Sequence, residues 1–288
     1  MSEFTRDMVR EWCKATTGEF HYKQILDGRI NIKLNPKAYD KLRADVEALC
    51  KEEVIESVGI RDGIYRRIEE LPLPVDWRPV NSLQDSGVIL PFDLRKYVWI
   101  DPNTSIVVAG SKDSGKTGFL MRTVVLNMNR ILTIFLTNME GGVNQVKRRF
   151  EAMGIDMVNP PFITYSVMDN YHDAIKDKDA LYVIDYIDVP ETGEFYMIAP
   201  ALAKIQAKLQ NSVAVIGLQK KTGSDFAYGG EQTLKKATLY LAMNPGRLKI
   251  ISAKISVDPK VQLKNKQWSF QYDEEGTNFI DIEPYYGG

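Results

Sequence analysis

Residues 110–117 read GSKDSGKT and match the pattern GxxxxGK followed by Ser or Thr. The apolar run SIVVAG before the motif predicts a β-strand, and TGFLMRTVVLNM after it has helical spacing. Strand, glycine loop and helix in this order form the context in which such a loop cradles phosphate groups. The alternative is an ordinary strand-to-helix turn with a surface lysine, and the flanking segments favour the phosphate loop over it.

The residue types in the loop suit a nucleotide with its metal ion. Backbone N–H groups of the loop and of the helix N-terminus point at phosphate oxygens. We expect Lys116 to reach the outer phosphates of ATP and the Thr117 hydroxyl to hold Mg²⁺. The predicted nucleotide contacts are Gly110, Ser111, Lys112, Asp113, Ser114, Gly115, Lys116, Thr117 and Gly118.

Around the loop, apolar runs alternate with helical stretches. The runs ILTIFLTN, ALYVIDYI and SVAVIGLQ are near-continuous, which is typical of parallel strands covered on both faces in an α/β fold. From about residue 238 the segments ATLYLAMN, RLKIISAKIS, QWSFQYD and NFIDIE predict successive strands that extend the sheet in mixed or antiparallel fashion.

Polar residues follow these strands at the sheet edge where ligands of α/β folds bind. Asp185 ends ALYVID and is expected to reach Mg²⁺, with Asp188 as a competitor and a helix cap or salt bridge as the alternative role. Glu140 follows ILTIFLTN and is the candidate general base for water, unless it only caps the helix predicted near Val143. Gln219 ends SVAVIGLQ and is a candidate sensor of the γ-phosphate.

The segment after Gln219 reads KKTGSDFAYGGEQTLKKA and is bracketed by lysines. It predicts either a DNA-binding loop or a solvated surface loop. The candidate DNA contacts in it are Lys220, Lys221, Lys235 and Lys236.

Composition limits the classes of function. The formal net charge of −1 means that nucleic-acid binding needs a local basic patch. Cys13 and Cys50 stand far apart without a CxxC motif, so we expect neither a disulfide framework nor a zinc site, and we expect a reducing compartment, the cytoplasm. No apolar run approaches the length of a membrane span, so we expect no membrane association.

The chain divides by composition into residues 1–70, a proline-containing linker or strap over 71–97, and residues 98–288. In the first part, FTRDMVREWCKATTG and NPKAYDKLRADVEALCKEE predict amphipathic helices, HYKQILDG lies between them, and VIESVG and IYRRIEE predict a hairpin. Three helices and a hairpin resemble a winged-helix (α+β) domain, in which the third helix enters the major groove and the wing touches the backbone.

The resemblance implies DNA contacts on the third helix and the wing. Residues 1–70 hold 13 Lys and Arg against 14 Asp and Glu, and this balance leaves a docking or oligomerisation module as the alternative. The candidate DNA contacts are Lys37, Lys41, Arg43, Arg61, Arg66 and Arg67.

Five segments, GSKDSGKT, TNMEGG, KRRF, YVIDY and GLQKK, resemble in this order the RecA-fold ATPases, most closely the DnaB, KaiC and RadA branch. The resemblance covers about residues 90–283. It implies a RecA-like, mostly parallel sheet with helices on both faces, and subunits that assemble as a hexameric ring or a filament with ATP between them. It also places Glu140 at the catalytic glutamate and Gln219 at the glutamine sensor.

In that family the strand similar to IISAKIS carries a lysine and, two residues on, an arginine, and both reach the neighbour's nucleotide. Lys254 occupies the first position, but Ser256 stands where the arginine is expected. Either Arg247 substitutes for that arginine or hydrolysis is slow. An ordinary strand-edge lysine is the alternative role of Lys254.

The sequence therefore predicts a Mg²⁺-dependent ATPase that acts on DNA. Three hypotheses remain: a DNA-dependent motor or helicase, an ATP-switched DNA-binding protein or helicase loader with slow turnover, and a recombinase-like filament former. The last one needs a segment that docks on the next subunit, and VILPF over residues 88–92 is its candidate.

Overall fold

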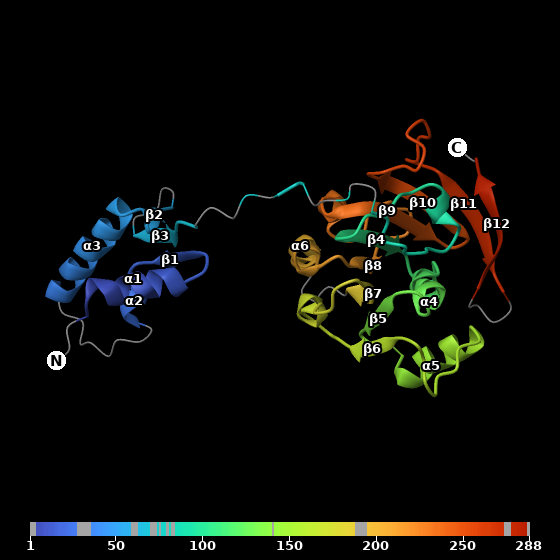
Figure 1. Cartoon of the computed structure of the whole chain (residues 1–288), viewed down its shortest axis with the longest axis horizontal. Coiled ribbons are helices and arrows are strands. Elements are labelled where there is room, and N and C mark those ends of the chain that lie inside the picture. Colours follow the sequence, from blue (N-terminus) through green and yellow to red (C-terminus); the bar gives the residue numbers. More distant parts are fainter. Residues whose placement is uncertain are drawn as a thin grey trace. The chain divides into compact units, whose positions relative to one another are not determined.

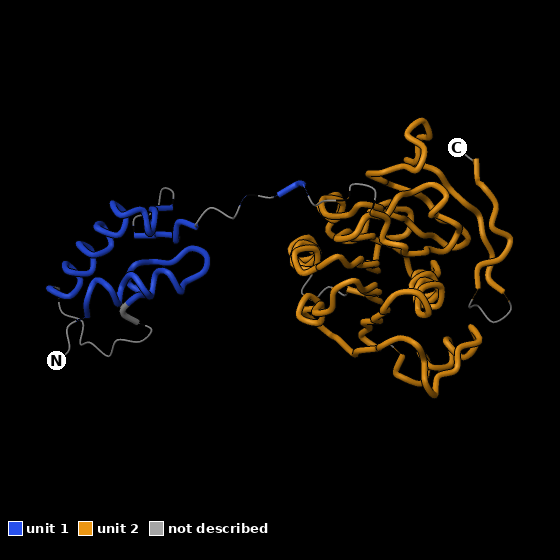
Figure 2. The backbone as a smooth tube through the Cα atoms, viewed as in Figure 1, with its two compact units in different colours: residues 1–80 blue, residues 81–288 orange. Residues whose placement is uncertain are grey.

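The chain forms two compact units, residues 1–80 and 81–288 (Figure 2). The structure, a computed structural model, describes residues 4–27, 36–58, 63–69, 74, 76–78, 81, 84–139, 141–187, 195–273 and 278–286.

The first unit packs helices against a small antiparallel sheet with the strand order β1-β3-β2. The helices and the hairpin lie where the sequence predicts them, but the strand β1 was not predicted. Three residues are too few for a period to show, and β1 is defined by its pairing with β3. The elements are α1 (Arg6–Ala15), β1 (Glu19–His21), α2 (Gln24–Asp27), α3 (Pro36–Lys51), β2 (Ile55–Ser57) and β3 (Ile64–Arg67).

A hydroxyl cap and an apolar stripe explain the first helix. The Thr5 hydroxyl accepts a hydrogen bond from the Met8 backbone N–H, which satisfies one of the free donors at the N-terminus of α1. Val9 and Cys13, four residues apart, are buried against the apolar face of α3. Burial raises the pKa of the Cys13 thiol to about 12, so this residue packs as a small hydrophobic side chain.

The second unit is built on a sheet in which the described residues form nine strands, in the order β12-β11-β10-β9-β4-β8-β7-β5-β6 (Figure 1). The strands from β9 to β6 are parallel, and β10, β11 and β12 continue the sheet antiparallel, as the sequence predicts. The strands are β4 (Thr104–Gly110), β5 (Leu132–Thr137), β6 (Ile163–Ser166), β7 (Ala180–Ile187), β8 (Val213–Gln219), β9 (Ala237–Asn244), β10 (Arg247–Ala253), β11 (Gln267–Tyr272) and β12 (Phe279–Tyr285).

Helices cover both faces of this sheet, which confirms the predicted α/β fold. On one face α4 (Lys116–Asn127) and α5 (Val143–Ala152) bury Phe119 and Phe150, and on the other α6 (Ile198–Lys208) buries Leu202 and Ile205. Among the described residues, no helix has both the length and the apolar character needed to cross a membrane. The shorter 3-10 helices are η1 (Leu94–Lys96), η2 (Tyr171–Ala174), η3 (Phe195–Met197) and η4 (Gly230–Leu234).

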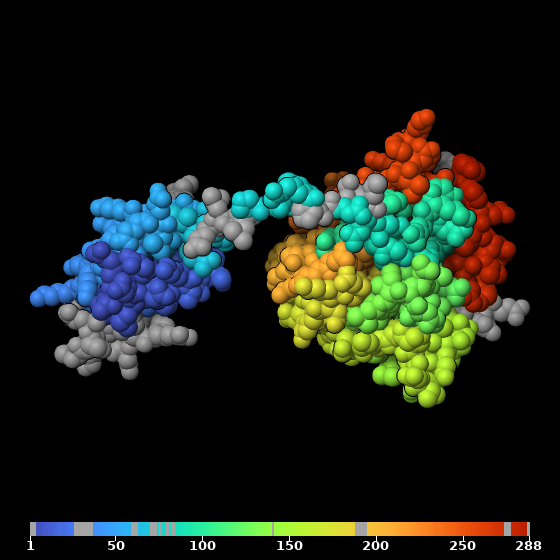
Figure 3. All heavy atoms as spheres, in the orientation of Figure 1, coloured from blue at the N-terminus to red at the C-terminus, as the bar shows by residue number. Residues whose placement is uncertain are grey.

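The VILPF segment belongs to the core of its own unit. Val88, Leu90 and Phe92 are buried in the same cluster as side chains of α4. In Figure 3 the teal surface of the first strands of this unit adjoins the green surface of α4. The buried Asn127 side chain accepts a hydrogen bond from the Ile89 N–H at 2.8 Å and donates one to the Ile89 carbonyl at 2.7 Å. These apolar side chains are therefore not free to dock on a second copy, which is what the filament hypothesis expected of them.

We expect Asn127→Ala to lower the free energy of unfolding by about 3 kcal/mol, because the Ile89 N–H and C=O both lose a buried partner. Urea unfolding followed by circular dichroism measures this change. Asn129→Ala is the matched control, because Asn129 is exposed just beyond the same helix, and its effect should stay within about 0.5 kcal/mol. Equal stability of the two variants would contradict this role for Asn127.

Candidate functional site

A cavity of about 1040 Å³ opens at the carboxyl ends of β4, β5, β7 and β8. Residues 111–118 line it, together with Thr137, Asn138, Asp185 and Gln219 from the other strands. The volume is sufficient for a nucleotide, since ligand sites of proteins commonly measure about 300–1,000 Å³. The topology thus brings the loop motif and the strand-end residues into one site, as the sequence predicts.

Two glycines give the loop its shape. A Cβ at Gly110 would lie 2.5 Å from Ser114 Oγ and 2.8 Å from Lys116 Cβ, so the loop closes on its own strand only with glycine there. Gly115 is the N-cap residue of α4 with a left-handed φ of 86°, which a residue with a side chain rarely adopts. Lys116, Thr117 and Gly118, in the first turn of α4, line the cavity, and the backbone N–H groups of a first turn have no partner within the helix.

Three buried hydroxyls around the loop have no hydrogen-bond partner among the described residues: Ser111 Oγ, Ser114 Oγ and Tyr272 Oη. A buried donor without an acceptor is costly, and phosphate oxygens are strong acceptors. Burial raises the pKa of Tyr272 to about 12, so its hydroxyl remains a donor at neutral pH. The donor set at the N-terminus of α4 fits an anionic group such as a phosphate.

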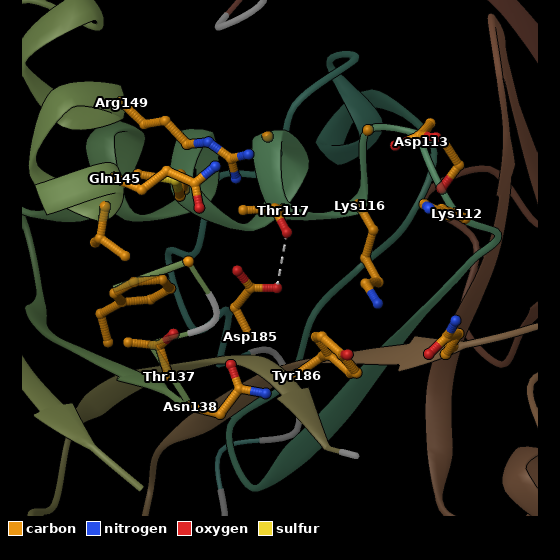
Figure 4. Close-up of a pocket in the computed structure, with 18 of the residues that line it drawn as sticks. Lys112, Asp113, Lys116, Thr117, Thr137, Asn138, Gln145, Arg149, Asp185 and Tyr186 are labelled. Atoms are coloured by element: carbon orange, nitrogen blue, oxygen red, sulfur yellow. Dashed lines mark hydrogen bonds between the residues drawn. The ribbon is translucent and has the colours of Figure 1, made fainter. Parts of the chain in front are cut away.

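Thr117 and Asp185 form the candidate metal side of the site. Thr117 Oγ1 donates a hydrogen bond of 3.2 Å to Asp185 Oδ1, as the dashed line in Figure 4 shows. A hydroxyl and a carboxylate are oxygen ligands of the kind that Mg²⁺ takes, usually with phosphates and waters completing the shell. The described residues contain no group of three His, Cys, Asp or Glu that could hold a metal by themselves. Thr117 and Asp185 would supply two of the oxygen ligands of such an ion.

Lys116 lies against an aromatic ring in this structure. Its side chain is buried, and Nζ is 3.6 Å from the centroid of the Tyr186 ring (Figure 4). Tyr186 follows Asp185 on β7, its peptide bond with Asp185 is cis, and its carbonyl accepts a hydrogen bond from Tyr171 Oη. The ring offers the ammonium group a cation–π contact within the cavity.

Gln219 ends β8, the strand that lies between β4 and β7. Its side chain lines the cavity, its carbonyl accepts a hydrogen bond from the Tyr228 N–H, and the next residue, Lys220, donates its N–H to the Gly110 carbonyl. The backbone around Gln219 therefore connects the glycine loop to the segment that follows β8.

Glu140, the predicted general base, lies outside the described residues. Its neighbours Asn138 and Gly141 line the cavity. The N-cap residue of α5 is Gly142, which has no side chain to cap with.

The lysines after β8 divide into two kinds. Lys220 is buried, and its ammonium donates to the Ser224 carbonyl at 2.7 Å and to Asn244 Oδ1 at 2.6 Å. Burial lowers the pKa of Lys220, while the nearby Asp225 opposes this shift. The structure thus gives Lys220 an internal role rather than the DNA contact expected of it, whereas Lys221, Lys235 and Lys236 are exposed.

Most of the Lys and Arg side chains predicted to contact DNA in the first unit already form hydrogen bonds or salt bridges within that unit. Lys41 donates to the Phe4 carbonyl, Arg43 to Tyr22 Oη, and Arg67 to the Lys14 carbonyl. Arg66 forms a salt bridge with Glu56. Lys37 is exposed near the start of α3, and Arg61 lies outside the described residues.

The two residues expected at a subunit boundary lie just beyond β10. Lys254 is exposed and does not line the cavity of its own chain. Ser256 Oγ donates to the Asp258 carbonyl at 2.7 Å, so a short hydrogen-bonded turn stands where the sequence resemblance implied an arginine. Arg247, the suggested substitute, places its guanidinium 3.8 Å from the ring centroid of Tyr285.

Several residues that line the cavity were not among the predicted site residues, among them the polar side chains of Gln145, Arg149, Tyr186 and Tyr272. Gln145 and Arg149 are four residues apart on α5, a spacing that was readable from the sequence once the helix was placed. Tyr186 follows Asp185 directly, but its ring carries no motif of its own. Tyr272 comes from a strand far along the chain, so only the fold reveals it.

No protein-family model matches the sequence, and no curated protein sequence matches it. Solved structures do match. One of them, "Crystal structure of the RadB recombinase", is 17% identical over 62% of this chain and 91% of that chain, with a TM-score of 0.43. A likeness this distant does not establish a family for the chain.

We expect Gly115→Ala to lower the free energy of unfolding by about 2 kcal/mol or more, because it strains the left-handed backbone and overlaps a neighbour. Its Cβ would lie 1.3 Å from Tyr272 Oη. Thermal unfolding measures the effect. Gly118→Ala is the control on the same helix, because its Cβ would meet only Phe279 at 3.8 Å and Tyr272 at 4.0 Å. A destabilisation by Gly118→Ala as large as that by Gly115→Ala would contradict the account of the loop.

Proposed function

We propose that the second unit is a Mg²⁺-dependent ATPase that hydrolyses ATP to ADP and phosphate. The observation that carries the proposal is the contact between Thr117 and Asp185, which sets a hydroxyl and a carboxylate under a glycine loop at one end of the sheet. This arrangement suits a nucleotide whose phosphates lie on the loop and whose metal ion lies on the two side chains.

Each residue of the site has a proposed role. The N–H groups of the loop and the buried hydroxyls of Ser111 and Ser114 bind phosphate oxygens. Lys116 carries the positive charge for the outer phosphates, and Thr117 and Asp185 hold Mg²⁺, which supplies charge neutralisation when bound. Glu140 remains the proposed base for water on the grounds of the sequence alone.

Gln219 is proposed to couple the nucleotide to the segment after β8. The side chain of Gln219 lines the cavity, and its backbone carbonyl is hydrogen-bonded to Tyr228. A movement of Gln219 in response to a nucleotide would therefore also move the segment that contains Tyr228. That segment carries the exposed Lys221, Lys235 and Lys236, and Tyr228 in it stacks on Phe195 with ring centroids 4.6 Å apart. Exposed cations and aromatic rings are the side chains that bind nucleic-acid strands, so we propose DNA as the partner of this segment.

Self-association, as a ring or a filament, belongs to the proposal too. The exposed Lys254 does not line the cavity of its own chain, which suits a residue that acts on a neighbour's nucleotide.

For the first unit, we propose a winged-helix role, with contacts to DNA or to a protein.

A slowly hydrolysing ATP switch is the second candidate function. The turn at Ser256 favours it, because a serine that donates to the Asp258 carbonyl supplies no charge to a neighbouring nucleotide. Such a protein would bind DNA or load a helicase in one nucleotide state and release it in the other.

We expect Asp185→Asn and Thr117→Val to lower the rate of Mg²⁺-ATP hydrolysis by about 10²-fold, because each removes an oxygen ligand of the metal. Phosphate release measured over a Mg²⁺ titration tests this, and the Mg²⁺ concentration at half-maximal rate should rise in both variants. The exposed Asp156, changed to Asn, is the control.

Glu140→Gln should bind ATP normally and hydrolyse it slowly, whereas wild-type turnover in that variant would remove Glu140 from the mechanism.

We expect the triple change Lys221→Ser, Lys235→Ser and Lys236→Ser to weaken DNA binding by about tenfold or more and to reduce its salt dependence, because phosphate contacts are lost. Fluorescence anisotropy with labelled single- and double-stranded DNA measures both. The control removes the exposed Lys176, Lys178 and Lys208, which precede the amino ends of β7 and β8. If both triple variants bind equally well, the segment after β8 does not contact DNA.

A further inference from the structure

We propose that Arg149 supplies positive charge to the terminal phosphate of the bound nucleotide from within the same chain, with Gln145 positioned beside it. This inference rests on the proposed ATPase function. It assigns to an arginine on α5 the positive charge toward the phosphates that was expected of an arginine at position 256, where the chain has Ser256.

A buried phenylalanine fixes the orientation of α5. Phe150 is fully buried, and its ring centroid lies 5.7 Å from that of Phe135 and 4.8 Å from that of Phe162. Close packing on two aromatic rings prevents the helix from rotating about its axis. The residue before it, Arg149, is therefore held on a defined side of α5.

That side of the helix faces the cavity. Gln145, Arg149 and Met153 are spaced by four residues, so they lie on one face of the helix, and all three line the cavity that Thr117 and Asp185 also line. Figure 4 shows the side chains of Gln145 and Arg149 extending from α5 toward Thr117. The guanidinium thus lies on the α5 side of the metal-binding pair.

The guanidinium has no competing partner in the part of the chain that the structure describes, where no side chain forms a salt bridge or a hydrogen bond with it. Lys147 on the same helix differs, because its ammonium lies 3.6 Å from Glu151 Oε1. An exposed arginine without a carboxylate can turn to a ligand at little cost.

Arginine suits the chemistry of this position. Its planar fork of N–H donors matches two phosphate oxygens at once. Negative charge on the transferred phosphoryl group must be stabilised as the bond to the leaving oxygen breaks, and a fixed cation contributes to that. Since Arg149 belongs to the chain that binds the nucleotide, its contribution needs no neighbouring subunit.

Three variants test the inference: Arg149→Ala, Arg149→Lys and the matched control Arg148→Ala, an exposed arginine on the same helix that does not line the cavity. We measure the binding of fluorescent ATP and ADP analogues and the rate of Mg²⁺-ATP hydrolysis. Arg149→Ala should lower the rate by about 10²-fold and weaken ATP about tenfold while leaving ADP binding unchanged. Arg149→Lys should recover part of the loss, and Arg148→Ala should behave as the wild type.

Mixing two inactive variants separates action within one chain from action across subunits. If Arg149 serves its own nucleotide, a mixture of Arg149→Ala with Lys116→Ala stays inactive. Recovery of activity in the mixture would overturn the inference, because it would show an arginine that acts on a neighbour.

The remaining outcomes distinguish this inference from the proposed function. If the wild type binds and hydrolyses ATP and Arg149→Ala does so equally well, the inference is wrong and the ATPase stands. An equal loss of ATP and ADP binding in Arg149→Ala also overturns it, since the residue would then support the shape of the site rather than the terminal phosphate. If the wild type binds neither nucleotide, the proposed function and the inference fall together.

Discussion

The hydrogen bond from Thr117 to Asp185 links the first turn of α4, which the loop after β4 leads into, to β7, a strand that is not a neighbour of β4 in the sheet. Asp185 belongs to β7, and β8 separates it from β4, which leads into the loop. Thr117 reaches Asp185 because the chain turns sharply at Gly115 and starts α4, which packs on β7 and β8. The tight loop, the strand β8 between β4 and β7, and the position of α4 therefore depend on one another. The cavity forms where these three features come together.

The parts of the site that the sequence predicted are those with a local signal. A glycine loop between an apolar run and a helical pattern defines its own structure, so residues 110–118 were predictable without knowledge of the fold. Asp185 and Gln219 were predictable because they end apolar runs, and the carboxyl ends of parallel strands share one edge of the sheet. The α/β architecture followed from the same runs, since strands buried on both faces lose their alternation.

The parts that the sequence did not predict depend on contacts between distant segments. Lys220 reads as a surface lysine until β9 brings Asn244 to its ammonium. Tyr272 reads as an ordinary strand residue until β11 places its hydroxyl against Gly115. Asn127 makes the strap part of the core through two hydrogen bonds to residue 89, which no periodicity shows. In each case the role of a polar atom depends on the group that it contacts, and that group lies in a distant segment of the chain.

The distribution of engaged cations bears on where DNA would bind. An arginine that already donates to a carbonyl or a tyrosine must give up that bond before it contacts a phosphate, so Arg43 and Arg67 begin at a disadvantage. The exposed lysines after β8 lose no such bond, and they follow Gln219, which lines the cavity. A DNA contact there would be coupled to the nucleotide through Gln219, whereas the charge-balanced first unit is better suited to a partner that does not require a basic surface.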